Sequence, residues 1–144
     1  TPNHFELEYL AGRTVATLAD ALAAAAALRA LGPKVVLVTS LTRAGATAGT
    51  IEMLADAADG AWLVATPRLP VEPPPNGAGD AVAALFLAHY LAAFDAAAAL
   101  EKAAAAIHAV FAVTHRAGTR ELQLIAAQQE LVAPSQTFRA EKVR

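Results

Sequence analysis

Residues 34–39 set the strictest limit on the fold of this 144-residue chain. They are dominated by β-branched and apolar side chains and show no alternation of polar and apolar residues. Such an unbroken run is typical of a central strand that is buried on both faces, as in parallel α/β sheets. Residues 14–31 are alanine-rich with apolar side chains at helical spacing, and Gly32 and Pro33 separate them from the run. The order of helix, turn and buried strand predicts an α/β fold.

The other segments are punctuated by glycine and proline in a way that suits this fold. Asn3 is a predicted N-cap with Glu6 at capping-box spacing, and the short helix that they begin should end at Gly12. We expect two strands joined by a turn at residues 56–60, which form an antiparallel edge of the sheet, and then a proline-rich loop over residues 67–75. Helices are predicted over residues 77–91, 96–115 and 121–132, and a last short strand over residues 136–140.

Composition excludes several classes of function. Hydrophobic residues make up 56% of the chain and charged residues 17%, so residues 1–144 are predicted to form one domain or a large part of one. The formal net charge is −2 and no basic stripe occurs, which argues against a nucleic acid partner. The chain has no cysteine, which excludes disulfide scaffolds, thiolate zinc sites and thiol catalysis, and fits a reducing cytosol.

The chain offers no sign of membrane insertion or secretion. Charged residues interrupt every alanine-rich stretch before the roughly 20 apolar residues that a membrane span needs. The polar start of the chain is unlike a secretory signal. Because the sequence begins with Thr1 rather than methionine, we expect either processing or a part of a longer gene product.

The segment Asn76-Gly77-Ala78-Gly79-Asp80, which leads into an apolar helix, is the clearest candidate for chemistry. Glycines permit a tight turn and the N–H groups of a helix N-terminus attract anions, so the segment predicts a phosphate site. A carboxylate repels a nearby phosphate, so its presence at such a site suggests a catalytic role. Asp80 could accept the proton of an attacking hydroxyl. The alternative is that Asp80 only caps the helix. The segment is neither a Walker A loop nor a Rossmann fingerprint.

Two further pairs of polar residues could likewise either bind a ligand or serve only the local structure. Asn3 and Glu6 could organise magnesium near a phosphate, or they could form only a capping box. Thr39 and Ser40 follow the buried strand, where α/β sheets bind ligands, but their hydroxyls could equally serve an ordinary turn. No histidine pairs with another ligand at metal-binding spacing. His89 and His108 lie in apolar helices, so we expect packed side chains there, and Trp62 is expected in the core.

Taken in order, these segments resemble the pyridoxal kinases of the ribokinase-like superfamily. Thr1-Pro2-Asn3-His4-Phe5-Glu6 is similar to the family's Thr-Pro-Asn-x-x-Glu segment, and residues 36–41 are similar to its nucleotide-contacting strand end. Gly77-Ala78-Gly79-Asp80 is similar to its Gly-x-Gly-Asp signature. Residues 121–134 are similar to pyridoxal kinase tails, which separates this family from sugar kinases. The resemblance covers nearly the whole chain but only the second half of the family's fold.

The resemblance implies the C-terminal half of a three-layer α/β/α sandwich. It implies phosphorylation of the 5′-hydroxyl of pyridoxal, or of a related B6 vitamer, with ATP and Mg²⁺. Asp80 would deprotonate the substrate hydroxyl, the N–H groups of Gly77, Ala78 and Gly79 would stabilise the transferring phosphoryl group, and Glu6 would bind magnesium. The residues implied in nucleotide binding are Thr1, Asn3, Glu6, Thr39, Ser40, Pro73, Pro74, Pro75 and Asn76.

The chain departs from the family pattern in a few places. Ala78 stands where threonine or valine is common, Thr39 stands where some members carry lysine, and residues 73–75 are three consecutive prolines. The family's first half normally holds most of the pyridoxal pocket and the lid. Two alternatives stay open, a related kinase for hydroxymethylpyrimidine or a sugar, and an inactive nucleotide-binding fragment. The resemblance also implies a cytoplasmic homodimer for the complete protein.

Overall fold

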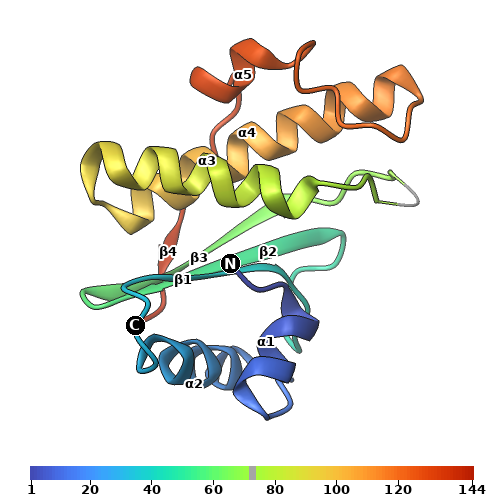
Figure 1. Cartoon of the computed structure of the whole chain (residues 1–144). Helices are drawn as coiled ribbons and strands as arrows, with labels where there is room; N and C mark the ends of the chain where they lie inside the picture. Colours follow the sequence, from blue (N-terminus) through green and yellow to red (C-terminus); the bar gives the residue numbers. More distant parts are fainter. Residues whose placement is uncertain (72–73) are drawn as a thin grey trace.

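A four-stranded sheet lies at the centre of the computed structural model, which describes residues 1–71 and 74–144 (Figure 1). The strands follow the order β1-β2-β3-β4, and every neighbouring pair is antiparallel. Their bounds are β1 (Val36–Leu41), β2 (Thr50–Ala57), β3 (Gly60–Pro67) and β4 (Glu141–Lys142).

Helices cover both faces of the sheet, so the chain has three layers (Figure 1). One face carries α1 (His4–Ala11) and α2 (Leu18–Arg29). The other carries α3 (Ala78–Ala93) and α4 (Ala96–Ala117), with α5 (Gln128–Val132) packed on α4. This arrangement is the partial ribokinase-like α/β/α sandwich that the sequence resemblance implied.

Strand β1 is buried on both faces, as its unbroken apolar run predicts. Val36 and Val38 pack into the core against α1 and α2, whereas Leu37 packs into the core against α3 and α4. The expectation of a parallel strand is wrong for its pairing with β2, which is antiparallel. The burial pattern depends on helices covering both faces of the sheet and carries no information on the direction of the neighbouring strand.

The predicted pair of strands is confirmed as the hairpin of β2 and β3, which turns at Ala58 and Asp59. Its expected place at the sheet edge is wrong. Strand β2 lies between β1 and β3, and β3 also pairs with β4 through Trp62 and Lys142. The edge position is taken by a segment near the end of the chain, which no local pattern connects to the hairpin.

Buried charge fixes that last segment to the hairpin. The carboxylate of Asp56 in β2 is fully buried. It accepts hydrogen bonds from Nε of Arg29 at 2.6 Å and from Nη2 of Arg144 at 2.5 Å. The Arg144 guanidinium also donates to the carbonyl of Ala57 at 2.8 Å. A buried carboxylate needs such partners, so these bonds hold the segment that contains β4 against the sheet.

Helix boundaries follow the capping chemistry. Helix α1 has the predicted capping box at Asn3 and ends at Gly12, which is left-handed at φ 63°. The predicted start of the next helix at residue 14 is wrong, because Thr17 is the N-cap of α2 and forms a capping box with Asp20. Val15 lies buried before the helix, and its N–H donates to Oε1 of Glu8 at 2.7 Å.

The predictions near the end of the chain are only partly right. The helix expected over residues 121–132 is reduced to α5 (Gln128–Val132), and the strand expected over residues 136–140 is instead β4 at Glu141–Lys142. Tertiary contacts decide both segments. The N–H of Gln123 donates to Oγ1 of Thr114 at 3.1 Å, and the N–H of Ala140 donates to Oε1 of Glu101 at 2.9 Å.

By length and mean hydropathy, α4 could cross a membrane. Within this fold it packs on α3, β2, β3 and α5, and 56% of its most apolar window is buried. The core of a folded domain therefore accounts for its apolar composition.

Candidate functional site

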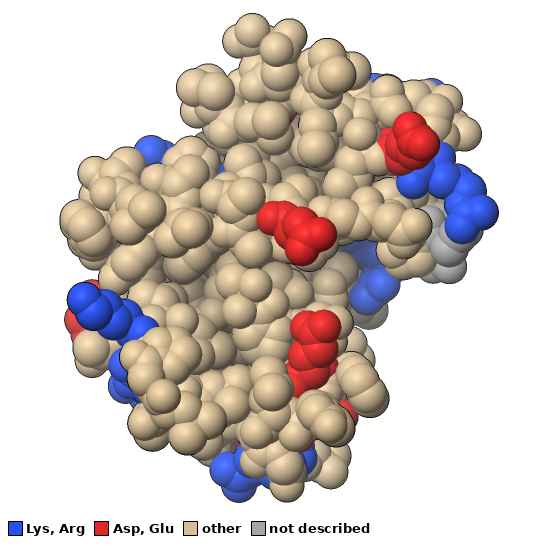
Figure 2. All heavy atoms as spheres, viewed as in Figure 1, with Lys and Arg blue, Asp and Glu red and all other residues tan. Residues whose placement is uncertain are grey.

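A cavity of about 350 Å³ opens where one end of the sheet meets the start of α3. Because β1, β2 and β3 are antiparallel neighbours, the ends of β1 and β3 lie beside the start of β2, as the pairs Leu41–Glu52 and Thr50–Pro67 show. The space-filling view has a recess on its right side, below the segment that leads into α3 (Figure 2).

The cavity has polar and apolar lining. The polar side chains come mainly from the strand ends and the apolar ones from β2, the loop after β3 and the helices. The polar set is Thr39, Ser40, Thr42, Thr66 and Arg68, and the apolar set includes Met53, Val71, Val82, Ile107 and Phe111. A site of this composition suits a ligand with a flat apolar part and a charged part.

An irregularity at the end of β1 brings Thr39 and Ser40 to the cavity. The pairing of β1 with β2 shifts register between Val38 and Leu41, so these two residues leave the regular ladder. Ser40 adopts φ 50°, which is left-handed and uncommon for a residue other than glycine. Bulges and strained backbone are common next to functional sites because they redirect side chains.

The start of α3 supplies the other wall of the cavity. Gly77 is the N-cap at φ 81°, with no side-chain cap hydrogen bond, and Ala78 and Gly79 line the cavity. The first intrahelical bond runs from the N–H of Ala81 to the carbonyl of Gly77 at 2.9 Å. The N–H groups before Ala81 therefore have no acceptor within the helix, and they carry its partial positive charge.

Asp80 is the third residue of α3 and is exposed. The alternative in which Asp80 caps the helix is wrong, because Gly77 holds the N-cap position and no side-chain cap bond forms. Asp80 stands in the first turn of α3, whose first N–H groups have no acceptor within the helix. The cavity lining reaches Ala78 and Gly79 but does not include Asp80.

The segment with Asn3 and Glu6 lies beside the end of β1. Asn3 and Thr39 form an isolated parallel bridge, and the Thr39 N–H donates to the Pro2 carbonyl at 2.9 Å. Asn3 Oδ1 accepts from the Glu6 N–H at 2.9 Å, and Glu6 Oε2 accepts from the Asn3 N–H at 2.8 Å. The capping-box alternative is thus confirmed. A role in binding magnesium or phosphate stays a prediction.

The structure brings some of the predicted residues together and leaves others apart. Those that line the cavity are Thr39, Ser40, Pro74, Ala78 and Gly79. Those outside the lining are Thr1, Asn3, Glu6, Pro75, Asn76, Gly77 and Asp80. The prediction for Pro73 lies outside the described residues.

Sequence reasoning missed Arg68 and the apolar side of the cavity. Arg68 follows β3, and its N–H donates to the carbonyl of Gly49 at 2.8 Å, which anchors it beside the start of β2. Among the described residues that line the cavity, Arg68 is the one whose side chain carries a full positive charge. A lone arginine after a strand gives no motif. Ile107 and Phe111 also give none, because their helical spacing is that of any core helix.

His108 also lines the cavity and packs as predicted, with its ring 5.0 Å from that of Phe138. Its Nε2 atom is buried and has no hydrogen-bond partner among the described residues. Burial lowers the pKa of His108, because the charged form loses water contacts. Burial also lowers the pKa of His89, and Lys102 lowers it further.

Within residues 1–71 and 74–144, no group of three or more histidine, cysteine or acidic side chains could hold a metal ion. Mg²⁺ often keeps several waters and binds through one or two carboxylates plus substrate phosphates. An exposed carboxylate such as Glu6 therefore fits magnesium only together with a nucleotide that supplies further oxygen ligands.

Known proteins resemble this chain in both sequence and fold. The phosphomethylpyrimidine kinase family model matches residues 1–124. Pyridoxal kinases PdxY of Deinococcus radiodurans and Rubrobacter xylanophilus are 54% and 56% identical to it, over 99% of this chain. The chain spans about half of their length, 49% in each case.

Solved structures give the same result for the fold. The pyridoxal kinase from Leishmania donovani in complex with ADP and pyridoxine superimposes with a TM-score of 0.86 at 24% identity. A complex of that kinase with ADP gives a TM-score of 0.83 at 25% identity. In both comparisons the match covers 100% of this chain and 50% of the kinase chain.

Proposed function

The chain belongs to the phosphomethylpyrimidine kinase family, and on this premise we propose that it is the nucleotide-binding part of a pyridoxal kinase. The reaction transfers the γ-phosphoryl group of ATP to the 5′-hydroxyl of pyridoxal or a related B6 vitamer. The cavity under the start of α3, which Thr39, Ser40 and Gly79 line together, supports this proposal. The names of the relatives at 54% and 56% identity support the choice of pyridoxal.

The two kinds of lining fit the two parts of ATP. Met53, Val71, Val82, Ile107 and Phe111 offer an apolar surface for the base. Thr39, Ser40 and Thr42 offer hydroxyls, and Arg68 offers a cation for the phosphates. A volume of about 350 Å³ falls in the range of small-molecule sites.

Phosphoryl transfer needs charge stabilisation more than covalent chemistry from the protein. The free N–H groups at the start of α3 attract the oxygens of the transferring group and pull it toward the helix end. The substrate oxygen forms a bond to the γ-phosphorus while the bond from that phosphorus to the β-phosphate oxygen breaks, and ADP leaves. Asp80 accepts the proton from the attacking hydroxyl.

Glu6 is the residue that would hold magnesium, which would neutralise charge on the phosphates when bound. Glu6 has one carboxylate oxygen in the capping box, where Oε2 accepts the Asn3 N–H at 2.8 Å. Glu6 is exposed, so its other oxygen is available to a bound ion or to one of the ion's waters. Asn3 positions Glu6 for this role through the cap.

A substrate panel tests the choice of reaction. The 144-residue chain is co-expressed with the half of the D. radiodurans kinase that it does not match, and the complex is assayed with ATP and magnesium. Pyridoxal should be phosphorylated faster than hydroxymethylpyrimidine or ribose. The name of the matching family points to a pyrimidine substrate. Faster turnover of hydroxymethylpyrimidine than of pyridoxal would therefore identify the enzyme as a hydroxymethylpyrimidine kinase. Nucleotide binding without turnover of any substrate would favour the alternative of an inactive nucleotide-binding fragment.

A further inference from the structure

Residues 42–49 connect β1 to β2 beside the cavity and are called the β1–β2 segment here. Thr42, at the start of the segment, lines the cavity. At its end, the carbonyl of Gly49 accepts the N–H of Arg68, which lines the cavity as well. The structure describes the whole segment, and none of its residues is buried. A segment with so few buried contacts opens easily unless a specific interaction holds it.

An ion pair anchors the β1–β2 segment to the sheet. Nε of Arg43 donates to Oε2 of Glu52 at 2.8 Å, and Nη2 of Arg43 donates to Oε1 of Glu52 at 2.9 Å. The side chain of Arg43 is 14% exposed and that of Glu52 is 5% exposed. Two parallel hydrogen bonds fix both the distance and the angle between a guanidinium and a carboxylate, whereas an apolar contact has no preferred direction.

The ion pair lies behind the wall of the cavity. Side chains alternate between the two faces along a strand, and Met53, next to Glu52 in β2, lines the cavity. Leu54 packs into the core against α1 and α2, so Glu52 lies on that face too. Neither Arg43 nor Glu52 belongs to the described lining of the cavity. The pair can therefore act on a bound nucleotide only through residues that the β1–β2 segment holds in place.

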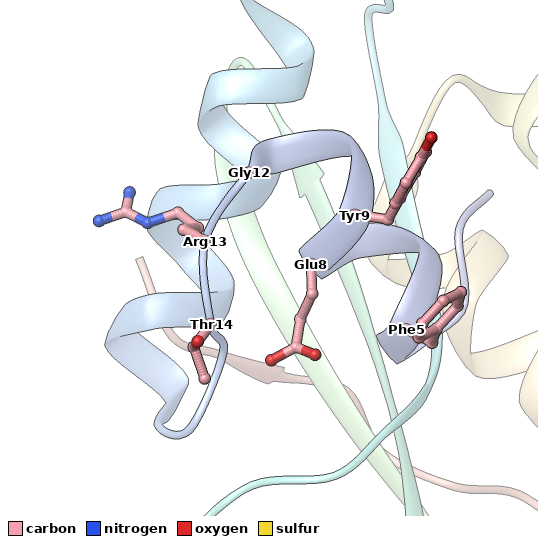
Figure 3. Close-up of a pocket in the computed structure, with 6 residues that line it drawn as sticks. All are labelled: Phe5, Glu8, Tyr9, Gly12, Arg13 and Thr14. Carbon is pink, nitrogen blue, oxygen red and sulfur yellow. The ribbon is translucent and has the colours of Figure 1, made fainter.

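Backbone contacts tie the β1–β2 segment to the helical layer on the same face. The N–H of Ala44 donates to the carbonyl of Ala16 at 2.8 Å. The preceding residue, Val15, donates its N–H to Glu8, whose side chain extends from α1 into the shallow groove that Thr14 also lines (Figure 3). The segment thus has a support on the side of α1 and α2, and the ion pair fixes it to β2.

Stability alone does not explain a buried ion pair at this place. Taking two charges out of water costs free energy, and replacing such a pair by apolar residues of similar volume is often neutral or stabilising. The pair does supply one fixed geometry. We propose that Arg43 and Glu52 are positioning residues of the nucleotide site. Their ion pair holds the β1–β2 segment so that Thr42 and Arg68 reach the phosphates of a bound nucleotide together. This inference rests on the proposed function.

A double replacement separates the positioning role from a structural one. Arg43→Met/Glu52→Leu fills similar space without charge, so the urea midpoint of the 144-residue chain should stay near that of the wild type. Calorimetry with ADP and magnesium should nevertheless show about tenfold weaker binding, because Thr42 and Arg68 lose their fixed positions. Hydrogen exchange at the Arg68 N–H of the ligand-free chain should become faster, since its acceptor on Gly49 is no longer held.

Arg43→Lys is the second variant, for the case in which the double replacement does not fold. It keeps a positive charge for the buried carboxylate of Glu52, so the chain should stay folded. It replaces the two parallel hydrogen bonds by a point charge, which does not fix the angle. ADP binding should therefore weaken and the exchange of the Arg68 N–H should become faster, as in the double variant but to a smaller extent.

Arg29→Met is the matched control. Arg29 pairs with Asp56 toward the other end of β2, where Arg144 remains as a partner. This variant should lower the urea midpoint and leave the affinity for ADP unchanged. Wild-type affinity in both Arg43 variants, or an equal loss of affinity in Arg29→Met, would overturn the positioning role and leave the proposed function intact. If the wild type itself did not bind ADP, the proposed function would fall, and the role of the ion pair in nucleotide binding would fall with it.

Discussion

Asn3 and Thr39 lie side by side in a parallel bridge, although 35 residues separate them in the sequence. The bridge places the capping box of α1 at the same end of the sheet as the cavity under α3. Through this contact, residues that form only a local helix cap in one part of the chain come next to the nucleotide site proposed in another. The cap and the proposed magnesium site therefore share Glu6, and substitutions can separate the two roles.

Glu6→Gln should keep the cap and lose the magnesium role. Glutamine can accept the same hydrogen bond at this position, so the free energy of unfolding should change by less than about 0.5 kcal/mol. Asn3→Ala should lower it by about 0.5–2 kcal/mol, because the Glu6 N–H loses its acceptor. Urea unfolding measures both values. Calorimetry with ADP should show weaker binding to Glu6→Gln only when magnesium is present, and an equal loss without magnesium would assign Glu6 to the cap alone.

Gly79→Ala should weaken nucleotide binding without harming the fold. A Cβ at Gly79 meets no atom within 4 Å, and alanine in a helix is favoured over glycine by about 1 kcal/mol. The added methyl group occupies space beside the phosphates and keeps them from the free N–H groups. We expect unchanged or raised thermal stability and at least about tenfold weaker ADP binding, since a lost charge-assisted contact costs about 1.5–3 kcal/mol. Ala84→Ser on the exposed side of α3 is the control, and equal affinity of Gly79→Ala and this control would contradict the site.

Asp80→Asn tests the proposed base. In the complex of the two kinase halves, the substitution should lower turnover of pyridoxal about 10²–10⁴-fold, because asparagine cannot accept the proton. ADP affinity of the 144-residue chain should be unchanged or higher, since one negative charge is removed beside the phosphates. Initial rates measure the turnover of pyridoxal, and calorimetry measures the affinity for ADP. Near-normal turnover would show that Asp80 is not the base.

The local features of the fold could be predicted from the sequence. The capping box at Asn3, the left-handed Gly12 and the hairpin around Asp59 depend on contacts within a few residues, so their patterns were sufficient. The three layers were implied by the family resemblance, and the burial of β1 on both faces agrees with them.

Contacts between segments distant in the chain could not be predicted from the sequence. The antiparallel partner of β1 and the pairing of β4 with β3 join segments whose local patterns do not specify each other. The cavity lining has the same origin, since Arg68 and Phe111 reach one site from a loop and a helix that are distant in the chain. Motif resemblance located Thr39, Ser40 and Gly79 but gave no reason to choose Arg68.

Acid should weaken the fold partly through His108. Burial holds its pKa below the ordinary value of about 6.5, so the neutral form is the one that the folded state prefers. The contribution is complete above about pH 6.5 and is lost as the pH falls through the lowered pKa, because the unfolded chain then binds the proton more readily. His108→Leu keeps a similar volume and removes the buried Nε2 atom, which has no partner among the described residues.

Urea midpoints at pH 8 and pH 5 check this prediction. The His108→Leu variant should lose less stability than the wild type on acidification, and it should match or exceed the wild type at pH 8. His89 also has a pKa lowered by burial and should account for part of the remaining loss. An identical loss in variant and wild type would mean that His108 does not contribute.

Amide NMR on the 144-residue chain shows directly where the nucleotide binds. The chain is labelled with ¹⁵N and titrated with ADP and magnesium. We expect shifts at the N–H groups of Thr39, Ser40, Arg68, Ala78 and Gly79, with those of Tyr9 and Gly12 in the shallow groove on α1 unchanged. Saturable shifts confined to the α1 groove, or no shifts at millimolar ADP, would show that the nucleotide does not bind in the cavity under α3.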